Sequence, residues 1–441
     1  MRILHYSLGF PPLRTGGLVK YSVDLAKEQS QKNNQVFFLY PGNIKIFNKK
    51  VCIRYDKHHS NENFHSYALI NSLPLPLFGG IRTPEDFMVT CDENVYLSFL
   101  NLIKPDVIHV HTLMGIHKEF FLAAKKMNIK IFFTTHDYFG LAPSPNFFFN
   151  GSDYSGNNGI YKWVEISNTA LPTWKLRMFQ SSLYPLLRKI MRKFKESKEI
   201  QLNIVHNECM DSFYPQKLRD MFYKLRKYYL SIFKLIDYFH FNSSISKEVY
   251  TSQLYISNRN SCVISITNSD ICVHNPHKNQ LKKSHNSKLK IGYIGPYKAF
   301  KGFYEFLKLQ DIIRGNVEFH IFGSNERIHL SDKFINHGKF NRDSLQDVYK
   351  TIDVLIVPSL WKETFGFVVP EAISFGVSVF VSSNVGAKDL VDDYFVFNSI
   401  DELREKIMNY SKFKGGNLKS MGQHFLEIQN MYNKCCYSCP K

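Results

Sequence analysis

Long apolar runs are absent from this sequence. A helix that crosses a bilayer needs about 20 consecutive apolar residues, and no stretch of the 441 residues approaches that length. Residues Met1 to Tyr6 run directly into a predicted strand, without the apolar segment and cleavage site of a signal peptide. We therefore expect the protein in the cytoplasm, where contact with the inner face of the membrane would be peripheral.

Cysteines are few, and their spacing shows no paired framework. The eight cysteines are scattered, and Cys436 and Cys439 form a Cys-x-x-Cys spacing with no second pair or histidine pair beside it. This pattern argues against a disulfide scaffold and against a structural zinc site. We expect reduced thiols.

Acidic residues are outnumbered by basic ones, 38 against 56, which gives a formal net charge of +18. Such a surface attracts anions, among them nucleotide sugars, phospholipid headgroups and nucleic acids. The sequence has no recognition-helix, zinc-finger or aromatic RNA-binding signature. We therefore expect no nucleic acid among its partners.

Two series of alternating strand and helix patterns predict the fold. The first begins with a strand over 3–7, a helix over 19–31 and a strand over 35–40, and the second runs from residue 290 to residue 381. Strands that alternate with helices form parallel sheets. We predict an α/β protein with two Rossmann-like domains, residues 1–275 and 286–415, that face a cleft. Residues 143–234 read as an insertion in the first domain, and the polar, lysine-rich residues 274–288 as a linker.

Glu363 and Glu371 flank a loop that enters a predicted helix. Pro370 suits the first turn of that helix, and apolar strand patterns precede and follow the unit. Glu363 is thus expected outside the carboxyl end of a parallel strand, the edge at which such sheets bind ligands. A carboxylate can accept both hydroxyls of a vicinal diol, so the pair suits a ligand with two sugars. The simpler alternative is that Glu371 only stabilises the helix dipole.

This segment resembles the Glu-x7-Glu motif of the retaining nucleotide-sugar glycosyltransferases of GT-B fold, of the large family four, or group 1, type. The resemblance covers the first 140 residues and roughly residues 235–400. It implies that Glu371 holds the ribose hydroxyls and Glu363 those of the donor sugar. It also implies that a helix over about 420–441 crosses back onto the first domain.

Gly16 and Gly17 lie between the first predicted strand and helix, where backbone amides can hold a diphosphate. The matching loop of the family faces the donor phosphates, and the Phe365-Gly366 turn would complete the cradle. The string Thr-Thr-His-Asp-Tyr around His136 resembles the family's Thr-x-His-Asp-Tyr segment. The resemblance assigns His136 to catalysis together with Glu363, at the reactive carbon of the transferred sugar.

Lys301 matches the lysine of the family's Lys-Gly pair, which holds the donor diphosphate. Gly323-Ser324 resembles the family's Gly-x-Gly turn, which commonly borders the nucleotide base, with Ser324 in place of the second glycine. The family's arginine after the strand-ending glycine is Pro296 here, which has no fork of donors for phosphate. Lys298 is a substitute by charge, but a lysine is not geometrically equivalent to an arginine.

We expect no metal and no other cofactor. The nucleotide-diphosphate sugar is counted as a substrate. His109 and His111 alternate along one predicted strand with no third ligand at a suitable spacing. Asp392 and Asp393 are adjacent, unlike the spaced carboxylates of metal-dependent transferases.

The stretch from Trp174 to Lys198 combines apolar and basic residues at near-helical spacing, with Pro185 interrupting it. Such a helix can lie in the interface of an anionic membrane. The alternative is a helix that packs one face on the domain and leaves a solvated basic face.

The resemblance thus implies a hexosyltransferase that moves a sugar from a nucleotide-diphosphate donor to a saccharide or lipid-linked saccharide, in bacterial surface polysaccharide synthesis. Its alternative, which Pro296 keeps open, is a catalytically weak GT-B homologue that acts as a partner in a polysaccharide assembly complex.

Overall fold

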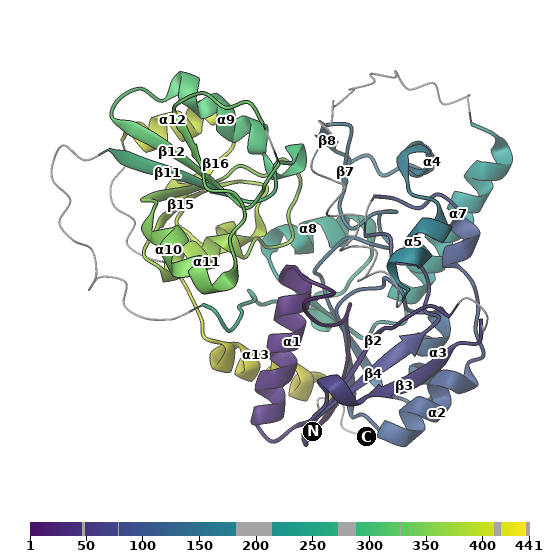
Figure 1. Ribbon diagram of the computed structural model, residues 1–441. Helices are drawn as coiled ribbons and strands as arrows, with labels where there is room; N and C mark the ends of the chain where they lie inside the picture. Colours follow the sequence, from purple (N-terminus) through teal and green to yellow (C-terminus); the bar gives the residue numbers. More distant parts are fainter. Residues whose placement is uncertain are drawn as a thin grey trace.

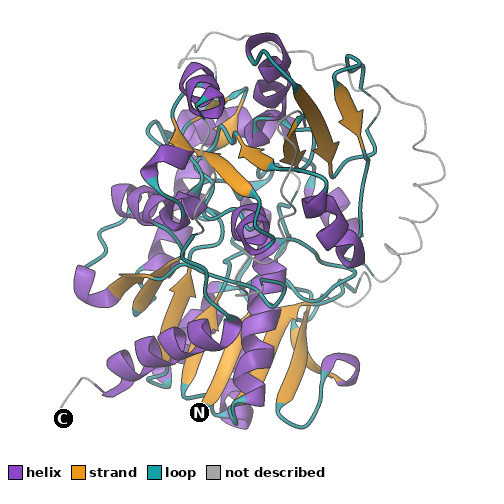
Figure 2. Ribbon diagram, turned by 90° about the vertical axis from the view of Figure 1, so that its left-hand side faces the viewer, coloured by secondary structure: helices purple, strands orange, loops and turns teal. Residues whose placement is uncertain are grey.

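The computed structural model describes residues 1–45, 49–77, 79–181, 214–271, 288–326, 328–409 and 416–437. These residues form two lobes, each built around a largely parallel sheet (Figure 1). Figure 2, turned by 90°, shows the two sheets as separate groups of strands, one low and one high. Residues 274–287 of the predicted linker lie outside the described residues.

The first lobe contains an eight-stranded sheet in the order β10-β9-β6-β5-β1-β2-β4-β3. Every pairing in it is parallel except that β3 runs antiparallel to β4. Its strands are β1 (Arg2–Tyr6), β2 (Gln35–Pro41), β3 (Cys52–Asp56), β4 (Phe64–Ile70), β5 (Val107–Val110), β6 (Lys130–Thr134), β9 (Tyr238–Phe241) and β10 (Ser261–Val263). The apolar runs of β1, β5 and β6 are buried because helices cover a parallel sheet on both faces.

The helices of this lobe connect its strands and build the region of the predicted insertion. They are α1 (Gly17–Gln31), α2 (Asn94–Ile103), α3 (Lys118–Lys126), α4 (Ile160–Thr169), α5 (Thr173–Phe179), α7 (Gln216–Phe233) and α8 (Ser244–Gln253). A short hairpin, β7 (Phe148–Phe149) and β8 (Ser152–Asp153), precedes α4. The predicted insertion, 143–234, therefore holds three described helices, and its residues 182–213 lie outside the described part.

The second lobe contains a six-stranded parallel sheet in the order β13-β12-β11-β14-β15-β16. Its strands are β11 (Leu289–Ile294), β12 (Val317–Phe322), β13 (Phe334–Asn336), β14 (Val354–Val357), β15 (Ser378–Ser382) and β16 (Val396–Phe397). Its helices are α9 (Phe303–Ile312), α10 (Leu345–Lys350), α11 (Val368–Ser374) and α12 (Ile400–Met408). Gly376, which follows α11, has φ +77°, the left-handed conformation that ends helices.

Helix α13 (Met421–Tyr437) returns to the first lobe and lies beside α1 (Figure 1). Its residues Met421, Phe425, Ile428 and Tyr432 recur at helical spacing and are buried. Tyr21 of α1 donates or accepts a hydrogen bond with His424 at 2.8 Å. The helix predicted to cross back onto the first domain is thus present. No helix in the described ranges is long and apolar enough to cross a membrane.

Candidate functional site

A cavity of about 490 Å³ lies between the two lobes, at the carboxyl ends of both sheets. Residues from the loops after β1, β6, β11 and β14 line it. Of the residues predicted from the sequence, Gly16, Gly17, His136, Lys301, Glu363, Phe365, Gly366 and Glu371 all do so, as does Pro296. Ser324 and Lys298 are not among the lining residues. Ser324 is buried after β12 and accepts from the Glu326 amide at 3.2 Å, and Lys298 pairs with Glu326 at 3.5 Å.

Lys301 is held at the cavity by two groups of the second lobe. Its ammonium forms an ion pair with Oε1 of Glu363 and lies 5.6 Å from the centroid of the Trp361 ring. The other oxygen of Glu363, Oε2, accepts from the Ser359 hydroxyl at 2.7 Å. Both oxygens of this buried carboxylate are therefore oriented by the protein, with a lysine at one of them.

Glu371 lies in α11, as the sequence predicts, but its bonds to the protein are long. Its Oε1 accepts from Asn268 at 3.5 Å and its Oε2 from the Tyr349 hydroxyl at 3.4 Å. Burial raises the pKa of the Glu371 carboxyl, while the charge of Arg342 and the two hydrogen bonds act in the opposite direction. A carboxylate whose two oxygens accept only long, weak hydrogen bonds from the protein can accept the two hydroxyls of a diol.

Two cations of the cavity were not assigned by the sequence reading. Arg342, in the short 3-10 turn Arg342–Ser344, lines the cavity and pairs with Asp270. Lys20 of α1 also lines it, at 2.9 Å from Asp24 and 3.0 Å from Asp270. The Arg342 guanidinium of the second lobe and the Lys20 ammonium of the first lobe thus both lie at the cavity.

Close contacts join the lobes beside the cavity. The Ser243 hydroxyl donates to the carbonyl of Thr364 at 2.6 Å, and the Thr364 hydroxyl donates to the carbonyl of His136 at 2.9 Å. A Cβ placed on Gly17 would come within 2.8 Å of the Phe367 ring. Glycine at position 17 therefore allows α1 to approach the second lobe more closely than any other residue would.

Asp137 follows His136 and is buried. Its Oδ2 accepts from the Thr112 hydroxyl at 2.8 Å and its Oδ1 from the Phe139 amide at 2.9 Å. Burial raises the pKa of this carboxyl to about 7. Asp137 therefore orders the turn after β6 that carries His136.

His136 stands at the end of a chain of hydrogen bonds through the core of the first lobe. Its Nε2 lies 3.2 Å from Nδ1 of His111, whose Nε2 lies 3.0 Å from Nδ1 of His5. Nε2 of His5 bonds Oε1 of Gln29 at 2.6 Å, and the Gln29 amide nitrogen donates to the hydroxyl of Tyr432 at 3.4 Å.

The chain continues from Tyr432 to a main-chain carbonyl. The Tyr432 hydroxyl bonds Nδ1 of His109 at 2.6 Å, and Nε2 of His109 bonds the Thr134 hydroxyl at 2.6 Å. That hydroxyl bonds Nδ1 of His240 at 2.8 Å, and Nε2 of His240 bonds the carbonyl of Ile264 at 2.8 Å.

One end of this chain determines the direction of every bond in it. Burial lowers the pKa of each of its imidazoles, so they are neutral at pH 7 and each carries one proton. The Ile264 carbonyl can only accept a hydrogen bond, so His240 donates to it from Nε2 and accepts at Nδ1 from the Thr134 hydroxyl. Every following group likewise donates toward the Ile264 end and accepts from the group nearer to His136. His136 therefore donates from Nε2 to His111 and keeps the lone pair of its Nδ1.

The same residues include a cluster that the sequence reading missed. One ring nitrogen from each of His5, His109 and His111 lies within 4.8 Å of the others. His5 supplies the third imidazole, which stands more than 100 positions earlier on a neighbouring strand and gives no local spacing signal. All six ring nitrogens have hydrogen-bond partners within the protein, so the cluster fits a hydrogen-bond chain better than a metal site.

Comparison with known proteins identifies the second lobe. Residues 274–418 match the family described as Glycosyl transferases group 1. The second lobe is a group 1 glycosyltransferase domain. An uncharacterized 42.6 kDa protein in the cps region of Klebsiella pneumoniae is 22% identical over 313 residues, 67% of this chain and 60% of that relative. The match thus covers less than two thirds of the relative's length.

The fold as a whole is similar to solved structures. A glycosyltransferase from Rickettsia africae superposes with a TM-score of 0.55 at 13% identity, and the apo lipopolysaccharide outer core galactosyltransferase WaaB with 0.53 at 12%; each match covers 99% of both chains. The starch synthase IV catalytic domain from Arabidopsis thaliana, bound to ADP and acarbose, gives 0.50 at 14% identity over 98% of this chain and 99% of that one. These likenesses confirm the predicted GT-B fold.

The glycosyltransferase domain contributes most of the predicted residues at the cavity. The basic residues that it places there differ from those expected from the sequence. Lys298, the predicted substitute for the family arginine, lies with Glu326 outside the cavity lining, whereas Arg342 lines it. Arg342 could have been suspected from sequence only as a basic residue opening a helix pattern, because nothing local points it toward Asp270.

Proposed function

We propose that the protein is a retaining hexosyltransferase, which moves a hexose from a nucleotide-diphosphate sugar to a saccharide or lipid-linked saccharide. The observation that carries the proposal is the arrangement of Lys301, Glu363 and Glu371 around one cavity. The three residues belong to the group 1 glycosyltransferase domain, and the carboxyl ends of both sheets face the cavity that they line.

In this proposal Glu371 holds the two ribose hydroxyls. They replace the long bonds from Asn268 and Tyr349, and both of these groups can turn to other partners. Glu363 accepts from hydroxyls of the donor sugar when Lys301 moves to the diphosphate. The ion pair between the two keeps each oriented while the donor is absent.

We further propose that Arg342 supplies the bidentate phosphate contact that Pro296 cannot make. Its guanidinium would exchange Asp270 for phosphate oxygens, with Lys301 and Lys20 as additional cations. The amides of Gly16 and Gly17, at the start of α1, would bind the same anion. Together these groups stabilise the leaving diphosphate.

His136 would act at the anomeric centre with the lone pair of Nδ1. A neutral imidazole oriented in this way accepts a hydrogen bond from a sugar hydroxyl and places negative potential near the positive charge that develops at the reactive carbon. Because the chain behind it fixes the tautomer, this acceptor is present before the substrate binds. We assign no protein nucleophile.

We propose surface polysaccharide synthesis as the setting, with the protein in the cytoplasm or peripheral on the inner face of the membrane. The location of the Klebsiella pneumoniae relative in a cps region supports this setting. The predicted membrane contact, Trp174 to Lys198, is described only as far as residue 181; there Trp174 is exposed and Leu176 is buried.

A thermal-shift panel of nucleotide sugars tests the proposal, because a ligand that binds the folded state raises the melting temperature. One nucleotide sugar should raise it in the natural protein and not in Glu371→Ala, and NMR of the product should show the anomeric configuration of the donor. A folded protein that binds no nucleotide sugar would favour the alternative that Pro296 suggests, a non-catalytic partner in an assembly complex. Unchanged transfer by Glu371→Ala would overturn the assignment.

A further inference from the structure

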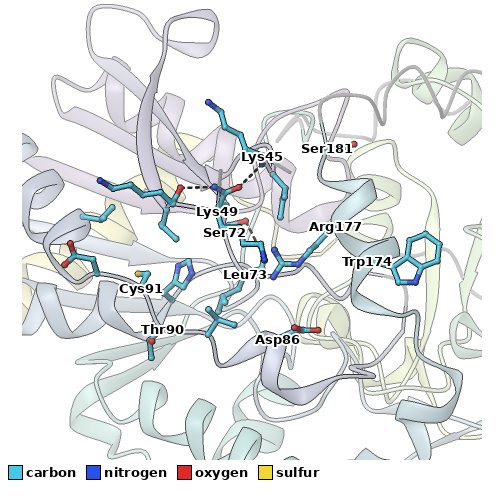
Figure 3. A pocket seen from close by; sticks show the side chains of 18 of the residues that line it. Lys45, Lys49, Ser72, Leu73, Asp86, Thr90, Cys91, Trp174, Arg177 and Ser181 are labelled. Atoms are coloured by element: carbon cyan, nitrogen blue, oxygen red, sulfur yellow. Dashed lines mark hydrogen bonds between the residues drawn. The ribbon is translucent and has the colours of Figure 1, made fainter. Parts of the chain in front are cut away.

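A second and larger cavity, of about 980 Å³, opens in the first lobe at the carboxyl ends of β2 and β4 (Figure 3). Its walls come from residues 44, 45 and 49–51 after β2, the turn after β4, residues 86–95 and helix α5. Figure 3 shows Lys45 and Lys49 on one side of it, Asp86 on the opposite side, and Arg177 reaching inward from α5.

Helix α5 is fixed against this cavity by Gln180, which is 4% exposed. The Gln180 side chain accepts from the Leu75 amide at 3.3 Å and donates to the Ser72 hydroxyl at 3.2 Å, and its carbonyl accepts from the Ile44 amide at 3.1 Å. The cavity is thus bounded by segments that hydrogen bonds hold together.

Asn71 fixes the opposite wall. It has φ +57°, and its side chain accepts from the Lys45 amide at 2.7 Å and donates to the Lys50 carbonyl at 2.8 Å. The main chain at Lys45 and at Lys50 therefore has a defined position at the cavity.

The lining combines apolar surface with an excess of positive charge. Its apolar part includes Ile44, Val51, Leu73, Val89, Val95, Trp174 and Met178. Its charged part has four basic side chains, Lys45, Lys49, Lys50 and Arg177, against two carboxylates, Asp86 and Asp92. A ligand that matches this lining has an apolar chain and an anionic group.

Arg177 is the most informative of these residues. It is half-buried, and among the residues that the structure describes its guanidinium has no hydrogen-bond or ion-pair partner. Leaving a charge partly desolvated without a partner is unfavourable, and a guanidinium matches phosphate oxygens in a bidentate way. Burial, with the charge of Arg177 adding, lowers the pKa of the neighbouring His117 to about 4, so that His117 adds no charge of its own.

We propose that this cavity binds a lipid phosphate, a single apolar chain that ends in a phosphate or diphosphate, with Arg177 on the phosphate. The identification of this lipid with the carrier of the saccharide acceptor rests on the proposed function. The segment from His111 to His117 links the two sites: His111 bonds His136 at the cleft and His117 lines this cavity. Six extended residues span at most about 22 Å, so His111 and His117 lie no farther apart than that. A diphosphate bearing a short saccharide can cover this distance.

The test measures binding of farnesyl phosphate to the full chain, below its micelle concentration, by calorimetry and by tryptophan fluorescence. Trp174 is one of three tryptophans and lines the cavity, so its emission should change on saturation, and Trp174→Phe should remove the signal. Arg177→Gln should weaken binding about tenfold or more. Arg259→Gln, an exposed arginine in the 3-10 turn Asn258–Asn260, is the matched control and should bind as the natural protein does.

Three further probes separate the sources of the signal. Farnesol should bind much more weakly than farnesyl phosphate, and inorganic phosphate should not compete at the same concentration. Vesicles of anionic phospholipid should bind Arg177→Gln and the natural protein alike. Equal binding of farnesol and its phosphate, full affinity in Arg177→Gln, or loss of only vesicle binding in that variant would each overturn the proposal. If farnesyl phosphate binds while no nucleotide sugar does, the site stands and the proposed function fails.

Discussion

The hydroxyl of Thr364, in the second lobe, donates to the main-chain carbonyl of His136, in the first, at 2.9 Å. Thr364 follows Glu363 directly, and its own carbonyl accepts from Ser243 of the first lobe at 2.6 Å. The loop that presents Glu363 is therefore attached to the strand end that presents His136. The positions of the two proposed catalytic groups are coupled, although they lie in different lobes.

Arg342→Gln is expected to weaken binding of a nucleoside diphosphate about tenfold, because it removes a charge-assisted hydrogen-bond donor from the cavity. Lys298→Gln is the control, since Lys298 pairs with Glu326 and does not line the cavity. Calorimetry with UDP, ADP and GDP would measure both. A loss in Lys298→Gln with none in Arg342→Gln would show that Lys298, and not Arg342, takes the place of the family arginine.

Tyr432→Phe interrupts the hydrogen-bond chain between Ile264 and Gln29. Without that hydroxyl the Gln29 amide can turn, and His136 should populate both neutral tautomers, which ¹⁵N NMR of its ring would report. We expect transfer to fall by roughly tenfold, with a stability loss of about 1 kcal/mol. Tyr6→Phe removes a buried hydroxyl that donates to the Met114 carbonyl at 2.7 Å, outside the chain, and should cost similar stability while the tautomer stays single.

Asp137 should make the protein less stable as pH rises from about 4 to about 7. Its pKa is raised from 3.8 to about 7, so between these values the folded state binds the proton more tightly than the unfolded state does. Stability from this group is full below about pH 4, declines up to about pH 7 by at most about 4 kcal/mol, and is then level. The melting temperature of Asp137→Asn, relative to the natural protein, should therefore rise between pH 5 and pH 8.

The exposed Asp311→Asn serves as the control for that measurement, and its melting temperature should follow the natural protein at every pH. A constant difference between Asp137→Asn and the natural protein across this range would contradict the assignment of the pH dependence to Asp137.

Gly302→Ala should disturb the position of Lys301. A Cβ at Gly302 would lie 1.7 Å from the Pro358 carbonyl oxygen, and the residue has φ +70°. Gly315 also has positive φ, at +118°, but a Cβ there meets nothing within 4 Å. We expect Gly302→Ala to lower the unfolding free energy by at least about 2 kcal/mol and to abolish donor binding, and Gly315→Ala to cost less. Chemical denaturation of both variants decides this.

Residues in the segments that leave the carboxyl ends of strands could be placed from the sequence. Glu363, Lys301 and His136 lie in the segments after β14, β11 and β6, and parallel strands bring their carboxyl ends to one edge. Residues whose position depends on contacts with distant parts of the chain could not be placed from the sequence. Arg342, Lys20 and His5 reach their neighbours only through the packing of separate elements, and the large cavity under α5 arises from Gln180 bridging segments over 100 positions away.

Helix α13 has a consequence for how the molecule is made. It supplies Tyr432 to His109 and His424 to Tyr21, yet it belongs to the part of the chain that leaves the ribosome after both sheets have been synthesised. Until then the nascent first domain has a buried imidazole without its partner and an uncovered face on α1. Expression of residues 1–271 alone should therefore give a fragment that aggregates, and co-expression of α13 as a separate peptide should rescue its solubility.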